Sequence, residues 1–170
     1  VIGIDAMNYK ITDTNINVDN LNILDNNTTG DIDTSHVTII TGLLATLLTL
    51  YGSLSGISGL EAMDFTLTDT SLNDTTGLTS LDLSTNGTID ASSINTITED
   101  ATSILTLYDP SFNIIGLGGV DIVLTDTTLT DITVLTGLDH FTTGTIDASG
   151  VTVISGPLDT TLTLYDSSSG

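Results

Sequence analysis

The chain has 170 residues and a formal net charge of −21, because 22 acidic side chains face a single base, Lys10, and Arg is absent. Surfaces that bind nucleic acid or anionic lipid need clustered Lys and Arg, so the composition predicts neither partner. Cys is absent as well, which excludes disulfides and thiolate metal sites. Apolar residues still make up 39% of the chain, enough to form a core.

The sequence carries no targeting signal that we recognise. Residues 1–5 lack the basic segment of a signal peptide, so we interpret the chain as a mature protein or a segment of a longer one. The longest apolar stretch, residues 43–51, is far shorter than the roughly 20 residues needed to span a bilayer, so we expect no membrane insertion. The high acidity favours an extracellular or cell-surface setting, where salt screens the repulsion between carboxylates.

A 57-residue repeat organises the whole chain. The segment GDIDTS at 30–35 recurs as GTIDAS at 87–92 and at 144–149, and Tyr51, Tyr108 and Tyr165 keep the same step. The repeat units are 30–86, 87–143 and 144–170, and the last of these joins in phase to 1–29 of a following copy. We therefore interpret 1–170 as one continuous array whose partner is itself, either as a head-to-tail homopolymer or within a longer tandem array.

Short β-branched runs predict strands, in chain order at 94–98, 120–124 and 132–135. Asp-x-Ser/Thr corners divide each repeat into units of about 19 residues. No stretch shows the 3.6-residue apolar periodicity of a capped helix, so we expect no substantial helix. The pattern predicts an all-β fold, a parallel β-solenoid (β-helix) of about nine coils of ~19 residues grouped as three repeats. A set of β-sandwich domains is the alternative.

The corner Asp residues are the candidate metal ligands. Carboxylate, carbonyl and hydroxyl oxygens are the ligands that Ca²⁺ prefers, so a stacked row of these corners predicts calcium sites; no other cofactor is indicated. In the alternative interpretation, each Asp accepts a hydrogen bond from the backbone N–H two residues on and faces water. The candidate ligands are Asp33, Asp69, Asp90, Asp109, Asp126, Asp147 and Asp166.

Other chemistry is weakly indicated. Thr-x-Thr pairs such as Thr68/Thr70 and Thr125/Thr127 are compatible with an ice-binding face, or simply with a solvated strand surface. His36 and His140 occupy different phases of the repeat, so we interpret them as isolated surface residues. β-Solenoids include sugar-cleaving enzymes, but nearly every Asp belongs to the repeat or to a variable corner rather than to a unique acid pair, so we predict no enzyme.

The run GTIDASSINTIT at 87–98, followed by Leu107-Tyr108 and LTDT at 124–127, resembles the tandem repeats of giant acidic, Thr-rich cell-surface proteins of marine cyanobacteria. The resemblance implies an extracellular structural or adhesive role. The sequence departs from the Gly-Thr-Ala-Ala-Asp expected in such repeats at 42–46, 99–102 and 156–159.

We therefore expect a structural subunit or segment of an extracellular filament or surface fibre that assembles head to tail by in-phase stacking of its terminal β-coils. Acidic side faces would keep neighbouring rods apart, or divalent cations would bridge them. The alternative is a calcium-dependent adhesin stalk, or an ice- or carbohydrate-binding β-solenoid.

Overall fold

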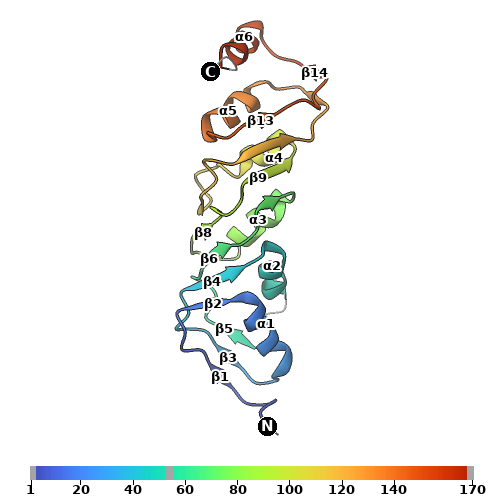
Figure 1. Cartoon of the computed structure of the whole chain (residues 1–170). Helices are drawn as coiled ribbons and strands as arrows, with labels where there is room; N and C mark the ends of the chain where they lie inside the picture. The colour runs from blue at the N-terminus through green and yellow to red at the C-terminus, as the bar shows by residue number, and fades with distance from the viewer. Residues whose placement is uncertain (1–2, 53–55, 168–170) are drawn as a thin grey trace. The chain divides into compact units, whose positions relative to one another are not determined.

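The computed structural model describes residues 3–52 and 56–167, with side chains through residue 164. Within these residues the chain alternates short strands with six helices (Figure 1). The helices are α1 (Val18–Asn27), α2 (Leu44–Gly52), α3 (Thr75–Asp82), α4 (Ala101–Thr106), α5 (Thr133–Phe141) and α6 (Leu158–Ser167). The strands are β1 (Tyr9–Lys10), β2 (Asn15–Asn17), β3 (Ile32–Asp33), β4 (Ile39–Gly42), β5 (Ile57–Ser58), β6 (Asp64–Leu67), β7 (Ser71–Leu72), β8 (Ile89–Asp90), β9 (Thr96–Glu99), β10 (Ile114–Ile115), β11 (Asp121–Leu124), β12 (Thr128–Leu129), β13 (Ile146–Asp147) and β14 (Val153–Ile154).

The fold is therefore mixed α/β, and the prediction of an all-β parallel β-solenoid without substantial helix is wrong. The helices form where apolar residues recur at every third position, as in Leu44, Leu47 and Leu50 of α2, all of which are buried. Thr is a poor helix former, and its abundance hides this short periodicity. Burial of one apolar face against the rest of the fold outweighs that propensity.

The strands pair in four parallel sheets, which we name A to D. Their strand orders are β1-β3-β5 in A, β10-β8-β6-β4-β2 in B, β13-β11-β9-β7 in C and β12-β14 in D. Paired residues lie 23 to 25 positions apart, for example Ile40 opposite Phe65 and Ile122 opposite Ile97. The predicted coil of ~19 residues is wrong because the connection between paired strands also contains a helix, as parallel crossovers commonly do.

The elements recur with the 57-residue step of the sequence, and the repeats 30–86 and 87–143 each contain five strands and two helices. Numbered in chain order within a repeat, the first strand is β3, β8 or β13; the second is β4, β9 or β14; the third is β5 or β10; the fourth is β1, β6 or β11; the fifth is β2, β7 or β12. Sheet B contains one strand of each kind. From one edge to the other these are β2 (a fifth strand), β4 (a second), β6 (a fourth), β8 (a first) and β10 (a third). Pairing therefore always joins different kinds of strand, which is why paired segments share little sequence.

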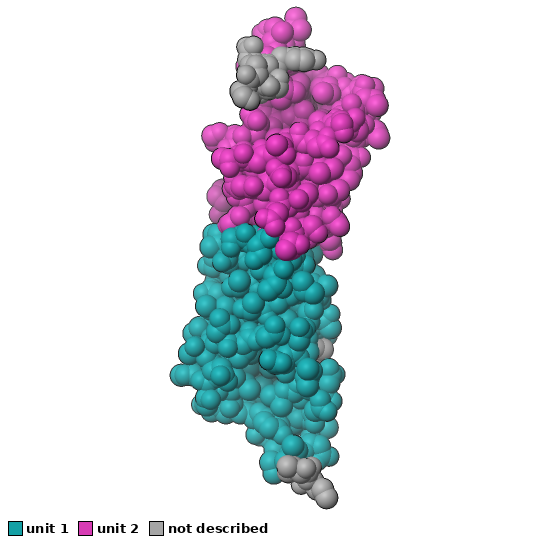
Figure 2. Space-filling view, viewed as in Figure 1, with its two compact units in different colours: residues 1–69, 76–93, 113–115 teal, residues 70–75, 94–112, 116–170 magenta. Residues whose placement is uncertain are grey.

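The chain forms two compact units, which Figure 2 shows in different colours. The first unit (residues 1–69, 76–93 and 113–115) contains sheets A and B, and the second (residues 70–75, 94–112 and 116–170) contains sheets C and D. In the first unit, α1 packs beside α2 and against β2 and β4. Each unit has its own apolar core, built around residues such as Ile40 and Phe65 in the first and Ile97 and Ile122 in the second. Each 57-residue repeat contributes strands to both units.

Candidate functional site

The Asp of the GTIDAS segment forms the same local turn in all three repeats. Asp33, Asp90 and Asp147 each accept a hydrogen bond from the backbone N–H of the Ser two residues on, at 2.9, 3.0 and 2.9 Å. The pKa of each of these carboxyls lies below its ordinary value. The larger cause is a hydrogen bond from the Ser side chain, and the smaller is the one from the Ser N–H. The ionised Asp therefore stabilises the corner that follows a strand.

A second kind of Asp joins paired segments. Asp69 follows β6 and accepts a hydrogen bond at 2.8 Å from the N–H of Leu44, the first residue of α2. Its equivalent, Asp126, accepts one at 2.8 Å from the N–H of Ala101, the first residue of α4. Each carboxylate thus caps a helix 25 residues earlier in the chain. A negative charge at a helix N-terminus is favourable because it satisfies a free N–H and complements the helix dipole.

The predicted calcium ligands do not stack on one another in the described part of the chain. Asp33, Asp90 and Asp147 lie in three different sheets, and Asp109 forms a separate turn with Ser111 at 2.8 Å. In these sheets Asp33 is paired with Lys10 and Ser58, Asp90 with Thr66 and Ile115, and Asp147 with Val123. The side chain of Asp166 lies outside the described residues. Among the residues that are described, no group of three or more His, Asp or Glu is placed to hold a metal ion.

The calcium row stays a prediction from the sequence, whereas the turns of Asp33, Asp90 and Asp147 match the alternative of a corner Asp that accepts a backbone hydrogen bond, and a melting experiment separates the two. If these Asp carboxylates act only as backbone acceptors, we expect the melting temperature to be the same in EDTA and in millimolar Ca²⁺ at constant ionic strength. Differential scanning fluorimetry is the measurement, with Mg²⁺ as the control for general charge screening. A melting temperature that rises in Ca²⁺ but not in Mg²⁺ would show that these carboxylates bind Ca²⁺.

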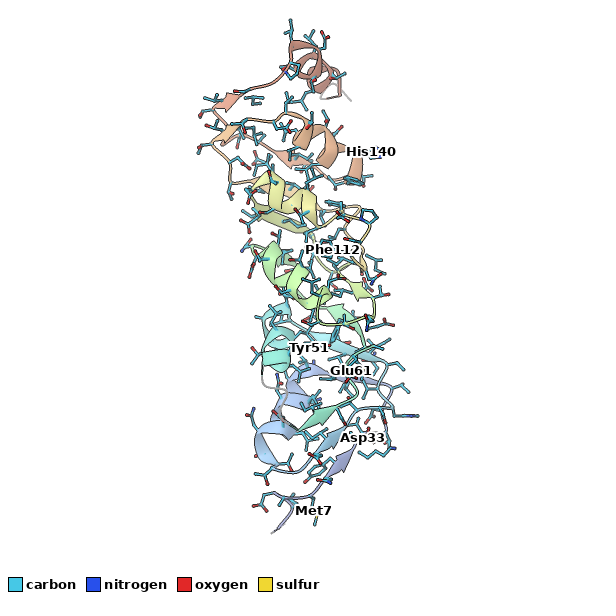
Figure 3. The ribbon with its side chains drawn as sticks, turned by 180° about the vertical axis from the view of Figure 1, so that it is seen from behind. Met7, Asp33, Tyr51, Glu61, Phe112 and His140 are labelled. Carbon is cyan, nitrogen blue, oxygen red and sulfur yellow. The ribbon has the colours of Figure 1, made fainter. Side chains whose placement is uncertain are left out.

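The Thr-x-Thr pairs also fall on different elements. Thr96 and Thr98 lie in β9, whereas Thr68/Thr70 and Thr125/Thr127 follow strands β6 and β11. In the sheet, Thr96 is paired with Ser71 and Asp121 rather than with Thr. His36 is exposed, and His140 packs edge-on against Phe141 with ring centroids 5.4 Å apart (Figure 3).

A Thr-x-Gly contact recurs that was not singled out from the sequence. We call it the Thr-Gly clamp, and it consists of Thr28/Gly30, Thr85/Gly87 and Thr142/Gly144. In each clamp the Thr hydroxyl accepts a hydrogen bond from the Gly N–H at 2.9 to 3.0 Å. The same hydroxyl donates to a backbone carbonyl 21 or 22 residues earlier, at 3.0, 2.8 and 2.6 Å. The carbonyls belong to Met7, Met63 and Val120.

Glycine is required in the clamp because the two backbone segments touch. A Cβ on Gly30, Gly87 or Gly144 would lie 2.1, 2.0 or 2.2 Å from that same carbonyl oxygen. The sequence signal that could have revealed the clamp is a Thr two residues before the repeated Gly at every 57-residue step.

Two equivalent tyrosines fasten a loop in each unit. The hydroxyls of Tyr51 and Tyr108 donate to the carbonyls of Leu60 and Leu117, each at 3.1 Å. The Tyr51 ring packs edge-on against Phe65, and Tyr51 is marked in Figure 3. Burial raises the pKa of both phenols to about 12.

This shift predicts loss of stability in alkali. A phenol whose pKa is higher in the folded protein than the unfolded value of about 10 contributes stability that is fully present below pH 10. That contribution is lost as the pH rises from 10 towards 12. We expect the melting temperature to fall across this range, and to fall less steeply in the double variant Tyr51→Phe/Tyr108→Phe. Equal slopes in the two proteins would contradict the assignment.

Apolar side chains are uncovered near the C-terminal end of the array. We call Val153, Ile154, Leu158 and Leu162 the C-terminal apolar face; they are 50, 43, 71 and 53% exposed. The residues at the same position as Ile154 in the two preceding repeats, Ile40 and Ile97, are 0% exposed. The residues equivalent to Leu158, which are Leu44 and Ala101, are 5% and 0% exposed. Ile154 and Leu158 are thus core positions that lack the segment covering them elsewhere, whereas the equivalents of Val153 and Leu162 are only partly buried.

A hollow of about 340 Å³ lies beside β2 and α1 in the first unit. Its lining includes Ile11, Ile16 and Leu24, which are only partly buried. We call it the N-terminal hollow. The residues equivalent to these three one repeat later are Leu67, Leu72 and Leu81, which are 0, 3 and 0% exposed. The hollow is again a core region that lacks its cover, and Ile4 and Met7 nearby in sequence are also exposed (Met7 is marked in Figure 3).

None of the helices in residues 3–52 and 56–167 has the length and apolar character needed to cross a bilayer. Comparison of the chain with protein-family models, with curated proteins and with solved structures gives no match. Functional inference therefore depends on the geometry described above.

Proposed function

We propose that this chain is a non-enzymatic structural segment of an extracellular filament or surface fibre. The observation that supports the proposal best is that the strands of one repeat belong to different sheets. The repeat at 30–86 contributes β3 and β5 to sheet A, β4 and β6 to sheet B and β7 to sheet C. A single repeat therefore cannot complete a sheet, and successive repeats are joined by backbone hydrogen bonds as well as by the covalent chain.

Such interleaving suits a load-bearing role. Sheet B is built from five strands that lie between residues 15 and 115, so it joins segments that are distant in the sequence. An array in which each repeat contacts only the neighbouring repeats can be extended without limit, because each added repeat meets the same surface. Within each repeat, a Thr-Gly clamp and the helix cap of Asp69 or Asp126 add hydrogen bonds between segments 22 to 25 residues apart.

The charge supports an extracellular location for the array. A net charge of −21 makes copies of the chain repel one another, and salt screens this repulsion. The resemblance of the repeats to those of giant cell-surface proteins favours the same location. In this proposal, assembly proceeds head to tail through the C-terminal apolar face and the N-terminal hollow.

Negative-stain electron microscopy tests the proposal. The purified chain, at increasing concentration in 0.5 M NaCl, is expected to form unbranched filaments that dissociate on dilution. A matched sample of Leu158→Asp, which places a charge in the C-terminal apolar face, should remain as single particles. If the unmodified chain stays as single particles at every concentration, the head-to-tail proposal is wrong.

A further inference from the structure

The incomplete sheets of the chain fit together. Sheet B has the full order fifth, second, fourth, first, third. Sheet D contains only the first two members of this order, the fifth strand β12 and the second strand β14. Sheet A contains only the last three, the fourth strand β1, the first strand β3 and the third strand β5. Sheets D and A are therefore complementary parts of one five-stranded pattern.

We infer that β14 of one copy pairs in parallel with β1 of the next copy, so that sheet D and the next copy's sheet A become one five-stranded sheet. The inference rests on the proposed function, which supplies the head-to-tail contact. It adds to that proposal the strands that meet and their register.

The register follows from the two equivalent pairs within the chain. In sheet B, β4 pairs with β6 so that Ile39 is opposite Asp64. In sheet C, β9 pairs with β11 so that Thr96 is opposite Asp121. The residue of β14 equivalent to Ile39 and Thr96 is Val153, and the residue beside β1 equivalent to Asp64 and Asp121 is Asn8. These two are therefore opposite each other at the junction.

The backbone hydrogen bonds transfer in the same way. The N–H of Asp64 donates to the carbonyl of Thr38 at 3.0 Å, and that of Asp121 donates to the carbonyl of Asn95 at 2.8 Å. At the junction the corresponding bond joins the N–H of Asn8 to the carbonyl of Thr152 in the other copy. The inward-facing neighbour of Val153 is Ile154, which the added strand covers as β11 covers Ile97 and β6 covers Ile40.

Apolar surface is available on both sides of this junction. The C-terminal apolar face meets the next copy's N-terminal end, where Ile11, Ile16 and Leu24 line the hollow. Edge strands that present unpaired N–H and C=O groups are templates for strand addition. The interior of the chain shows how each of these positions is covered when a further repeat is present, and a second copy of the same sequence supplies such a repeat.

Cysteine cross-linking tests the register, and the chain offers a clean background because it contains no Cys. Residues opposite each other in neighbouring strands are about 4.8 Å apart, within the range that a disulfide spans. We would mix Val153→Cys with Asn8→Cys in a glutathione redox buffer, and mix Val153→Cys with Lys10→Cys as the control. Position 10 is two residues further along the strand, which places it more than about 7 Å from position 153, too far for a disulfide.

We expect the disulfide between positions 153 and 8 to exceed that between 153 and 10 by at least about tenfold, as measured by mass spectrometry of cross-linked peptides. Filaments that form without this preference would overturn the register and leave the proposed function standing. Absence of cross-links between the Cys variants, together with absence of filaments from the chain without substitutions, would overturn the proposed function and this inference together.

Discussion

Gly87→Ala is expected to destabilise the chain by about 4 kcal/mol or more, at the upper end of what single substitutions do. The added Cβ would lie 2.0 Å from the carbonyl oxygen of Met63 and 2.5 Å from its carbonyl carbon. Both atoms are backbone, so the contact cannot be relieved by rotating a side chain. The Thr-Gly clamp would have to open, which would cost Thr85 its two hydrogen bonds.

Gly119→Ala is the matched control, because a Cβ there would meet nothing within 4 Å. We expect its free energy of unfolding to remain within about 1 kcal/mol of the parent. Urea denaturation followed by circular dichroism measures both variants. If Gly87→Ala does not accumulate as folded protein, Thr85→Val provides a milder test, since it keeps the backbone shape and removes only the hydroxyl. Similar stability for Gly87→Ala and Gly119→Ala would show that the clamp is not a close backbone contact.

Ile97→Ala is expected to cost about 2–5 kcal/mol, whereas Ile154→Ala should cost the dilute single chain well under half of that. The two residues occupy the same repeat position, but Ile97 is 0% exposed and Ile154 is 43% exposed. The larger cost at Ile97 arises because truncation leaves a cavity that the surrounding core cannot fill. Urea midpoints at low protein concentration would measure the difference.

The same pair also reports on assembly. Where filaments form, Ile154 should be covered, and Ile154→Ala should then raise the concentration needed for assembly. Equal destabilisation by the two substitutions in the dilute chain would contradict the assignment of Ile154 as an uncovered core position.

The sequence period was predictable, but the pairing of strands was not. The 57-residue step of Gly30, Gly87 and Gly144 is visible because it relates identical positions. The spacing of 23 to 25 residues between paired strands relates different kinds of strand, such as β6 with β8, and therefore leaves no self-similarity in the sequence. The ~19-residue unit was wrong because the corners on which it depends are unlike. Asp90 lies at the end of strand β8, whereas Asp109 follows helix α4.

Two of the three β-branched runs predicted as strands are strands, and the third lies in a helix. The runs at 94–98 and 120–124 overlap β9 and β11, whereas the run at 132–135 lies at the start of α5. There, Asp131 accepts hydrogen bonds from both the N–H and the hydroxyl of Thr133, at 2.9 and 2.6 Å, which favours a turn into a helix. Leu135 and Leu138 are then buried on one face. β-Branched residues alone could not distinguish the two outcomes, because packing decided them.

The candidate site was partly visible as well. The turn that Asp33, Asp90 and Asp147 form with the following Ser is local, so its residues are adjacent in the sequence. The role of Asp69 and Asp126 depends on a helix 25 residues away and could not be read locally.

The most direct test of an extendable, interleaved array is the urea unfolding of two copies joined directly, Gly170 to Val1, compared with the single chain. The join adds no residue, and Gly144 is followed by the next copy's Gly30 after 56 residues, one fewer than the step within the chain. Completing the sheet at the junction should cover Ile154 and Leu158, so the fused protein is predicted to unfold at a higher urea concentration and in one transition. A midpoint equal to that of the single chain would show that the two copies fold independently, and would contradict the account.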